Sequence, residues 1–195
     1  DSIVKGTVAD VEVQPRNDVV NQSDNSASDG SNADESGNNT SDSTPTLKPG
    51  VVTKIENLDG VVKAQGSVSA TGVHAIGKNG KAIASFGPPQ MGSNWYALPA
   101  FGGQQGVVLK SGHAPTSDSQ VVVDPQTLEK SGYRVGDRMR IITSDSGTIT
   151  ATIVGTATWG SGGTAGASYL FFDQHRAQQL FADGRDAFTG IGVQT

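Results

Sequence analysis

The chain has 195 residues, of which 34% are hydrophobic and 26 are glycine, and it contains no cysteine. This length suits one domain or two small lobes that share a core. The lack of cysteine excludes disulfides and thiolate metal sites. No lysine or arginine occurs between Arg16 and Lys48, where six acidic residues lie, and the other 13 acidic residues nearly balance the 14 basic ones. The remainder is therefore near neutral, which argues against a nucleic-acid partner.

The first predicted element is a strand over residues 3–13, which are rich in valine and isoleucine and alternate in character. Residues 21–44 follow, built almost entirely of Ser, Asn, Asp, Gly, Thr and Ala. Such a segment has too little apolar surface to offset the entropy of ordering it. We therefore expect a disordered acidic loop over residues 21–44.

A helix is expected to begin at Pro49 and to end at Gly60, with Val51, Ile55 and Leu58 on its buried face. Residues 61–69 form a strand in this interpretation.

Residues 74–84 predict a hairpin that turns at Lys78-Asn79-Gly80. Asn-Gly favours a type I′ turn at that point. Residues 86–106 show no regular pattern and are interpreted as a loop or extended arm.

Two short strands are predicted next, over residues 107–109 and 120–123. Asp124 followed by Pro125 is typical of a helix N-cap and first turn, and Gly132 ends that helix. A hairpin then joins strands over residues 138–143 and 148–154, and its second strand alternates between threonine and apolar residues. This alternation indicates that one face is buried and the other is wet.

The last elements are an apolar strand over residues 169–172, a helix capped by Asp173, and a strand over residues 188–193. The helix should end before Gly184. Its buried stripe is expected to consist of Ala177, Leu180 and Phe181. In total the pattern predicts an α+β fold with more strand than helix.

No constellation of residues predicts an enzyme, a cofactor site or a metal site. His74, His113 and His175 lack the spacing of metal ligands. Ser161 is flanked by glycines, but a nucleophile elbow needs glycine two residues before the serine, and Trp159 stands there. We therefore expect a protein without catalytic residues.

Three aromatic residues, Trp95, Tyr96 and Phe101, lie in a stretch rich in proline and glycine. They could form an exposed surface for a partner. They could equally close a small core from outside. The sequence leaves both alternatives open.

The chain also resembles the extracytoplasmic domain of MacB/FtsX-type ABC-transporter permeases, known as the MacB-like periplasmic core. The resemblance rests on the order and spacing of several short passages. They include Leu58-Asp59-Gly60-Val61, residues 108–115, 119–124 and 128–137 with its Val135-Gly136-Asp137 turn, residues 153–157, 167–173 and 177–181.

The resemblance implies a strand-rich domain of two lobes. A βαβ-type, membrane-proximal lobe would consist of residues 1–88 and 155–195, drawn from both ends of the chain. A mostly β lobe over residues 89–154 would be inserted into it. The acidic segment 21–44 is longer than the corresponding link in the family.

The resemblance further implies a location outside the bacterial cell membrane, between two transmembrane helices of one permease. The expected partners are those helices, a cognate cytoplasmic ATPase, and an unknown transported substrate or extracytoplasmic partner. The chain opens without methionine in one apparent strand and stops in another at residues 191–195, so we expect both ends to continue into a longer protein. No apolar run approaches the roughly 20 residues that span a bilayer.

Two other functions are compatible with the sequence. A secreted or surface-anchored module could bind carbohydrate or peptide on a platform of Trp95, Tyr96 and Trp159. A hydrolase could use Ser161 with His113 or His175, which requires a serine in contact with a histidine that a carboxylate holds.

Overall fold

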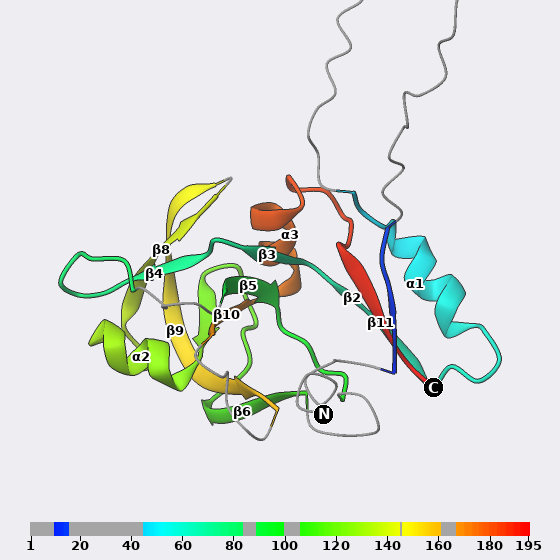
Figure 1. Ribbon diagram of the computed structural model, residues 1–195, viewed down its shortest axis with the longest axis horizontal. Helices are drawn as coiled ribbons and strands as arrows, with labels where there is room; N and C mark the ends of the chain where they lie inside the picture. Colours follow the sequence, from blue (N-terminus) through cyan, green and yellow to red (C-terminus); the bar gives the residue numbers. More distant parts are fainter. Residues whose placement is uncertain (1–9, 16–44, 84–88, 100–105, 145, 161–166) are drawn as a thin grey trace, which may run out of the picture.

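The computed structural model describes residues 10–15, 45–83, 89–99, 106–144, 146–160 and 167–195 (Figure 1). Strands predominate over helices in these residues, and they form one sheet of three strands and one of eight. The predicted α+β, two-lobed fold is confirmed. The predicted disordered loop over residues 21–44, most of the strand over residues 3–13, Phe101 and Ser161 lie outside the described residues.

The smaller sheet joins segments from the two halves of the chain. Strand β11 (Gly190–Gln194) lies in its centre, between β1 (Val11–Val13) and β2 (Lys63–Ser67), and both pairings are antiparallel. Helix α1 (Pro49–Glu56) lies beside this sheet (Figure 1).

Helix α1 rests on the smaller sheet through its apolar face. Val51, Val52 and Ile55 pack against a cluster of Ala64, Ile191 and Val193. The prediction that Leu58 belongs to this face was wrong. The helix ends at Glu56, and Leu58 is 59% exposed in the turn that follows.

The larger sheet is mixed and curled. Its main row consists, in order, of β3 (Ser69–Thr71), β5 (Gln90–Asn94), β10 (Ser168–Phe172), β7 (Gln120–Val123), β9 (Gly147–Trp159), β8 (Arg138–Thr143) and β4 (His74–Ile76). Strand β6 (Val107–Gly112) pairs with β9 beside this row. Strand β10 runs parallel to β5, and β7 runs parallel to β9, while the other neighbours are antiparallel.

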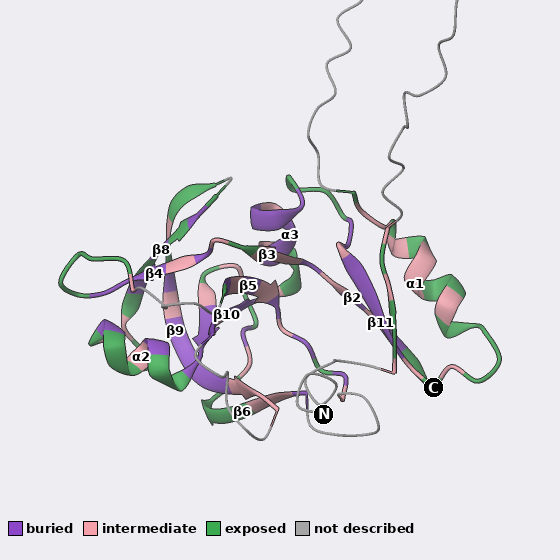
Figure 2. Ribbon diagram, viewed as in Figure 1, coloured by how far each residue is buried: buried purple, intermediate pink, exposed green. Residues whose placement is uncertain are grey.

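Helix α3 (Gln174–Phe181) covers part of one face of this sheet, where the main core lies (Figure 2). Its predicted stripe of Ala177, Leu180 and Phe181 is buried, and Phe181 meets the Phe172 ring edge-on at 5.9 Å between centroids. The Asp173 cap is confirmed, since its carboxylate accepts a hydrogen bond from the His175 backbone N–H.

Helix α2 (Pro125–Ser131) also begins and ends as the sequence predicts. The Asp124 carboxylate accepts from the Thr127 backbone N–H at 2.9 Å. Gly132 closes the helix at φ 71°, a conformation that glycine adopts without strain.

The prediction of a loop or arm over residues 86–106 was wrong for β5, which lies inside the larger sheet between β3 and β10. Its sequence, Gln-Met-Gly-Ser-Asn, contains no β-branched or aromatic residue, so local propensity gives no strand signal. The neighbouring strands supply the pairing, and Gly92 allows the Phe181 ring to approach closely.

The hairpin after β4 is confirmed by a bridge between Ile76 and Ala82, but its turn is not type I′. A type I′ turn needs positive φ at two successive residues. Gly80 has φ 78°, whereas Asn79 does not have a positive φ. The Gly80 N–H instead donates to the Gly77 carbonyl and closes a β-turn over residues 77–80, and Gly80 itself has the left-handed conformation that ends a three-residue loop.

The two sheets draw on different parts of the chain. The smaller sheet uses both chain ends, and the larger sheet uses strands from Ser69 to Phe172. The division into lobes at residues 88/89 and 154/155 stays a prediction.

We predict that Gly92→Ala lowers the free energy of unfolding by about 2 kcal/mol, because overpacking a filled core costs roughly this much. A Cβ atom there would lie 2.6 Å from the Phe181 ring and 2.9 Å from Val73. Urea unfolding would measure the change. Gly50→Ala in helix α1 is the matched control, since a Cβ there meets nothing within 4 Å and alanine favours the helix. Equal stabilities for both variants would contradict this packing.

Candidate binding pocket between the two sheets

One continuous segment of the chain belongs to both sheets. Strand β2 of the smaller sheet ends at Ser67 and β3 of the larger sheet begins at Ser69, so Val68 alone separates them (Figure 1). Val68 is fully buried. This residue therefore marks the junction at which the chain passes from the smaller sheet to the larger one.

The side chain of Asn94, itself fully buried, holds this junction. Its Oδ1 accepts from the Val68 backbone N–H at 2.8 Å, and its Nδ2 donates to the Gly66 carbonyl at 3.1 Å. The Asn94 backbone N–H also donates to the Val68 carbonyl. Where the strand leaves one sheet for the other, the amide thus replaces the missing partner strand.

Two further side chains link the sheets. The Gln65 amide donates to the Trp95 carbonyl and accepts from the Ala97 N–H, as a neighbouring strand would. The Thr189 hydroxyl accepts from the Ser69 N–H and donates to the Ser67 carbonyl. These bonds join the segments before β11 and after β5 to the same junction.

A pocket of about 320 Å³ lies beside this junction. It is lined by residues of both sheets, so neither sheet forms it alone. The smaller sheet contributes Glu12, Ser67 and Gly192, the larger sheet Ser69, Met91, Ser93, Asn94, Tyr169 and Trp159, and the segment after β5 contributes Tyr96.

The strand register explains why this part of the sheet is hollow. Ser69 lies opposite Ser93, and Met91 lies opposite Tyr169, so each pair faces the same side. At these positions the side chains are small hydroxyls, whereas the rest of the sheet carries valine, isoleucine or phenylalanine. The serine side chains fill less space than those residues would, and the space that they leave is the pocket.

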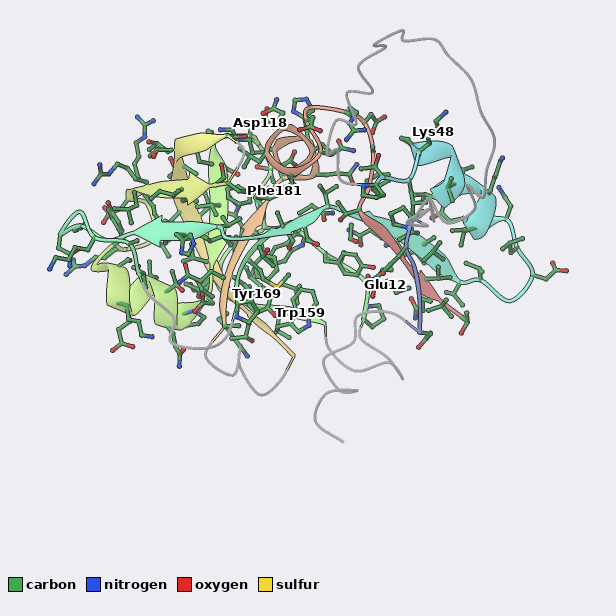
Figure 3. All side chains as sticks on the ribbon, turned by 45° about the horizontal axis from the view of Figure 1, so that its top comes forward. Glu12, Lys48, Asp118, Trp159, Tyr169 and Phe181 are labelled. Carbon is green, nitrogen blue, oxygen red and sulfur yellow. The ribbon has the colours of Figure 1, made fainter. Side chains whose placement is uncertain are left out.

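Aromatic rings form one wall of the pocket. Trp159 and Tyr169 stack with centroids 5.5 Å apart and planes 10° apart, and Figure 3 shows their labelled side chains close together. Phe171 lies nearly parallel to both at about 6 Å, which supports the wall from the core. Burial raises the pKa of Tyr169.

Tyr96 connects this region with the smaller sheet. Its side chain is 5% exposed, and burial is the largest cause that raises the pKa of its phenol. The negative charge of Glu12 raises it further, and a hydrogen bond with the Gly192 backbone opposes both effects. Glu12 of the smaller sheet and Tyr96 of the segment after β5 are therefore close enough for the charge of one to act on the other.

The residues named from the sequence as a partner contact have different environments. Tyr96 is buried beside Leu98, and Trp95 is half-buried with its ring edge-on to Phe171 at 5.9 Å. Phe101 lies outside the described residues. The contact with a partner stays a prediction.

Sequence reasoning missed Glu12 and the serines of the pocket. Nothing in their local pattern distinguishes them from exposed strand residues. In the structure Met91 and Ser93 are on one side of β5 and the buried Gly92 and Asn94 on the other, an alternation in burial that the residue types alone do not show.

The histidines make ordinary polar contacts in the described residues. The His113 ring contacts the Ala114 carbonyl at 2.7 Å, and the exposed His175 ring contacts Asp118 at 2.9 Å. Within the described ranges, no three His, Asp or Glu residues gather where they could hold a metal ion. The serine of the hydrolase hypothesis, Ser161, is outside those ranges.

Comparison with solved structures identifies a related fold. The extracellular domain of the noncanonic ABC-type transporter YknZ from Gram-positive bacteria superposes with a TM-score of 0.50. The match covers 77% of this chain and 73% of that domain, at 11% sequence identity. This chain shares the fold of that domain.

The periplasmic region of MacB from Actinobacillus actinomycetemcomitans is also similar, with a TM-score of 0.47, 15% identity, and 76% of this chain matched. This chain spans 64% of that region. No protein-family model matches the chain, and no curated protein matches it in sequence. No helix among the described residues is long and apolar enough to cross a membrane.

We predict that Asn94→Ala lowers the free energy of unfolding by about 3 kcal/mol, because it leaves the buried Val68 N–H and Gly66 carbonyl without their side-chain partner. Chemical denaturation would measure the loss. Asn57→Ala removes an exposed bond to the Thr53 carbonyl and should change stability by less than about 0.5 kcal/mol. A loss at Asn94 no larger than this control would show that the junction does not depend on the amide.

Tyr96→Phe should flatten the loss of stability at alkaline pH. Folding raises the pKa of Tyr96 above its ordinary value of 10.0. The protonated phenol therefore contributes fully to the free energy of unfolding below pH 10, and this contribution is lost as the pH rises further. Tyr96→Phe lowers stability at pH 7 by removing the hydroxyl, yet its unfolding free energy should fall less steeply above pH 10. Thermal unfolding from pH 7 to 11 would measure both slopes. Parallel curves over the whole range would contradict the burial of this phenol.

Proposed function

We propose that this chain is an extracytoplasmic domain of an ABC-transporter permease, which couples ATP hydrolysis by a cognate cytoplasmic ATPase to movement or substrate handling outside the membrane. The observation that carries the proposal is the fold shared with the extracellular domain of YknZ over three quarters of both chains. The motif order in the sequence supports it independently. No catalytic group is required of the domain for this role.

The pairing of β1 with β11 fits such a role. The Asp10 N–H donates to the Val193 carbonyl at 2.9 Å, and the Thr195 N–H donates to the Asp10 carboxylate at 2.9 Å. The beginning of β1 and the end of β11 thus lie side by side. In the proposal each leads toward a transmembrane helix of the permease, so that a shift of either helix acts on one small sheet.

The route from the smaller sheet to the larger one is short. Strand β11 pairs with β2 over five residues, and β2 continues through Val68 into β3. Because Asn94 and Thr189 hold this junction, the two sheets would move together as a rigid body. In this proposal residues 1–88 and 155–195 form the membrane-proximal lobe and residues 89–154 the inserted lobe. The transported substrate or extracytoplasmic partner is unknown.

A surface module that binds carbohydrate or peptide is the alternative. One observation favours it, namely that Trp159 and Tyr96 both line the pocket. Trp95, the third residue of that hypothesis, packs against Phe171 instead. This alternative needs no flanking membrane helices, so the location of the domain distinguishes the two.

The location can be tested because the chain has no cysteine. Val62→Cys, at a position 71% exposed, should react in intact cells with a maleimide that cannot cross membranes, when the chain is expressed within its full-length protein. Val121→Cys, at a fully buried position, should react only after denaturation. Labelling of Val62→Cys only after cell lysis would overturn the proposed location.

Coupling to ATP can be measured in the full transporter with labels on Leu58→Cys and Val135→Cys, which are 59% and 44% exposed. A rigid body predicts that the distance between these two labels stays constant during ATP turnover. Energy transfer from Val135→Cys to a dye in the lipid headgroups should change in the same conditions. An unchanged transfer efficiency would contradict coupling, and a changed distance within the domain would contradict rigid-body motion.

A further inference from the structure

We infer that the pocket between the two sheets binds an organic cation, a small ligand with an ammonium or guanidinium group on a short apolar stem. This goes beyond the proposed coupling function and does not depend on it. The inference rests on the charge, the aromatic wall and the size of the pocket.

The charge of the lining is negative. Glu12 is the only acidic side chain among the described residues that line the pocket, and no lysine, arginine or histidine is among them. The ion pairs formed within the described ranges involve Asp118, Asp137 and Asp183, and the Glu12 carboxylate accepts from the Gln14 amide at 3.3 Å. The exposed Glu12 carboxylate would attract a cationic ligand, whereas an anion would be repelled.

The aromatic wall suits the same ligand. Trp159 and Tyr169 lie parallel on the side of the larger sheet. A cation within about 6 Å of such rings is attracted by their electron-rich faces. Met91, opposite Tyr169 in the sheet register, offers a polarizable apolar contact for the stem of the ligand.

Hydroxyl groups and size complete the chemistry. Ser67, Ser69 and Ser93 present oxygen atoms that can accept from the several N–H groups of an ammonium or guanidinium. A volume of about 320 Å³ lies at the low end of the roughly 300–1,000 Å³ of ligand pockets. The ligand therefore has the size of one amino-acid side chain with its attached backbone, or of a simple amine.

Calorimetry and backbone NMR on the 195-residue chain would test this with three probes, and with a methyl glucoside as a carbohydrate comparison. Nα-acetyl-lysine methylamide represents a peptide side chain, n-butylammonium a free amine, and Nα-acetyl-norleucine methylamide an uncharged control. At least one cationic probe should bind at least tenfold more tightly than the norleucine probe and shift the signals of Ser93 and the Trp159 indole. Preference for the lysine probe identifies a peptide side chain as the source, and preference for butylammonium identifies a free amine.

Variants then assign the contacts. Glu12→Gln should weaken binding of the cationic probe about tenfold, the usual scale for a hydrogen bond to a charged group. Trp159→Leu should weaken it about threefold. Glu129→Gln, an exposed change on helix α2, is the matched control and should leave the affinity unchanged.

Three results would overturn the inference. The first is equal binding of the lysine, butylammonium and norleucine probes, and the second is an affinity that Glu12→Gln does not change. The third is binding of a methyl glucoside without binding of either cation, which would favour the carbohydrate module. The location experiment on Val62→Cys is unaffected by any of them, so failure here leaves the transporter proposal standing.

Discussion

The arrangement of the whole domain depends on one buried amide, the side chain of Asn94 at the point where β2 becomes β3. A strand that passes from one sheet into another leaves backbone groups without a partner strand, and in a buried place each such group is costly. Asn94 supplies both a donor and an acceptor there. These hydrogen bonds tie the segment that passes from β2 to β3 to the end of β5.

The pocket lies where one segment of the chain passes from the smaller sheet to the larger one. Three serines, Ser67, Ser69 and Ser93, are among the side chains that line it there. The same junction is the short route by which a movement of β1 and β11 would reach the larger sheet. The candidate pocket and the short route between the sheets therefore lie at the same place, so a ligand in the pocket would contact both sheets.

Much of the fold could be predicted from local patterns. The alternation in β9, the Asp124 and Asp173 caps, and the buried stripe of helix α3 were each predicted and observed. Such features depend on residues that are neighbours in sequence, where propensity and periodicity act directly. Strand β5 was missed because its residues have weak strand propensity, and only β3 and β10 on either side make it a strand.

The sequence by itself determined the class of fold, the caps of helices α2 and α3 and the faces of β9, since these follow from interactions within a few residues of the chain. The tertiary structure decided the candidate site. Glu12, Ser67, Met91 and Trp159 come from four separate strands, and only sheet pairing brings them to one pocket. It also decided that Tyr96 faces the charge of Glu12, because an electrostatic contact depends on distance in space and not along the chain.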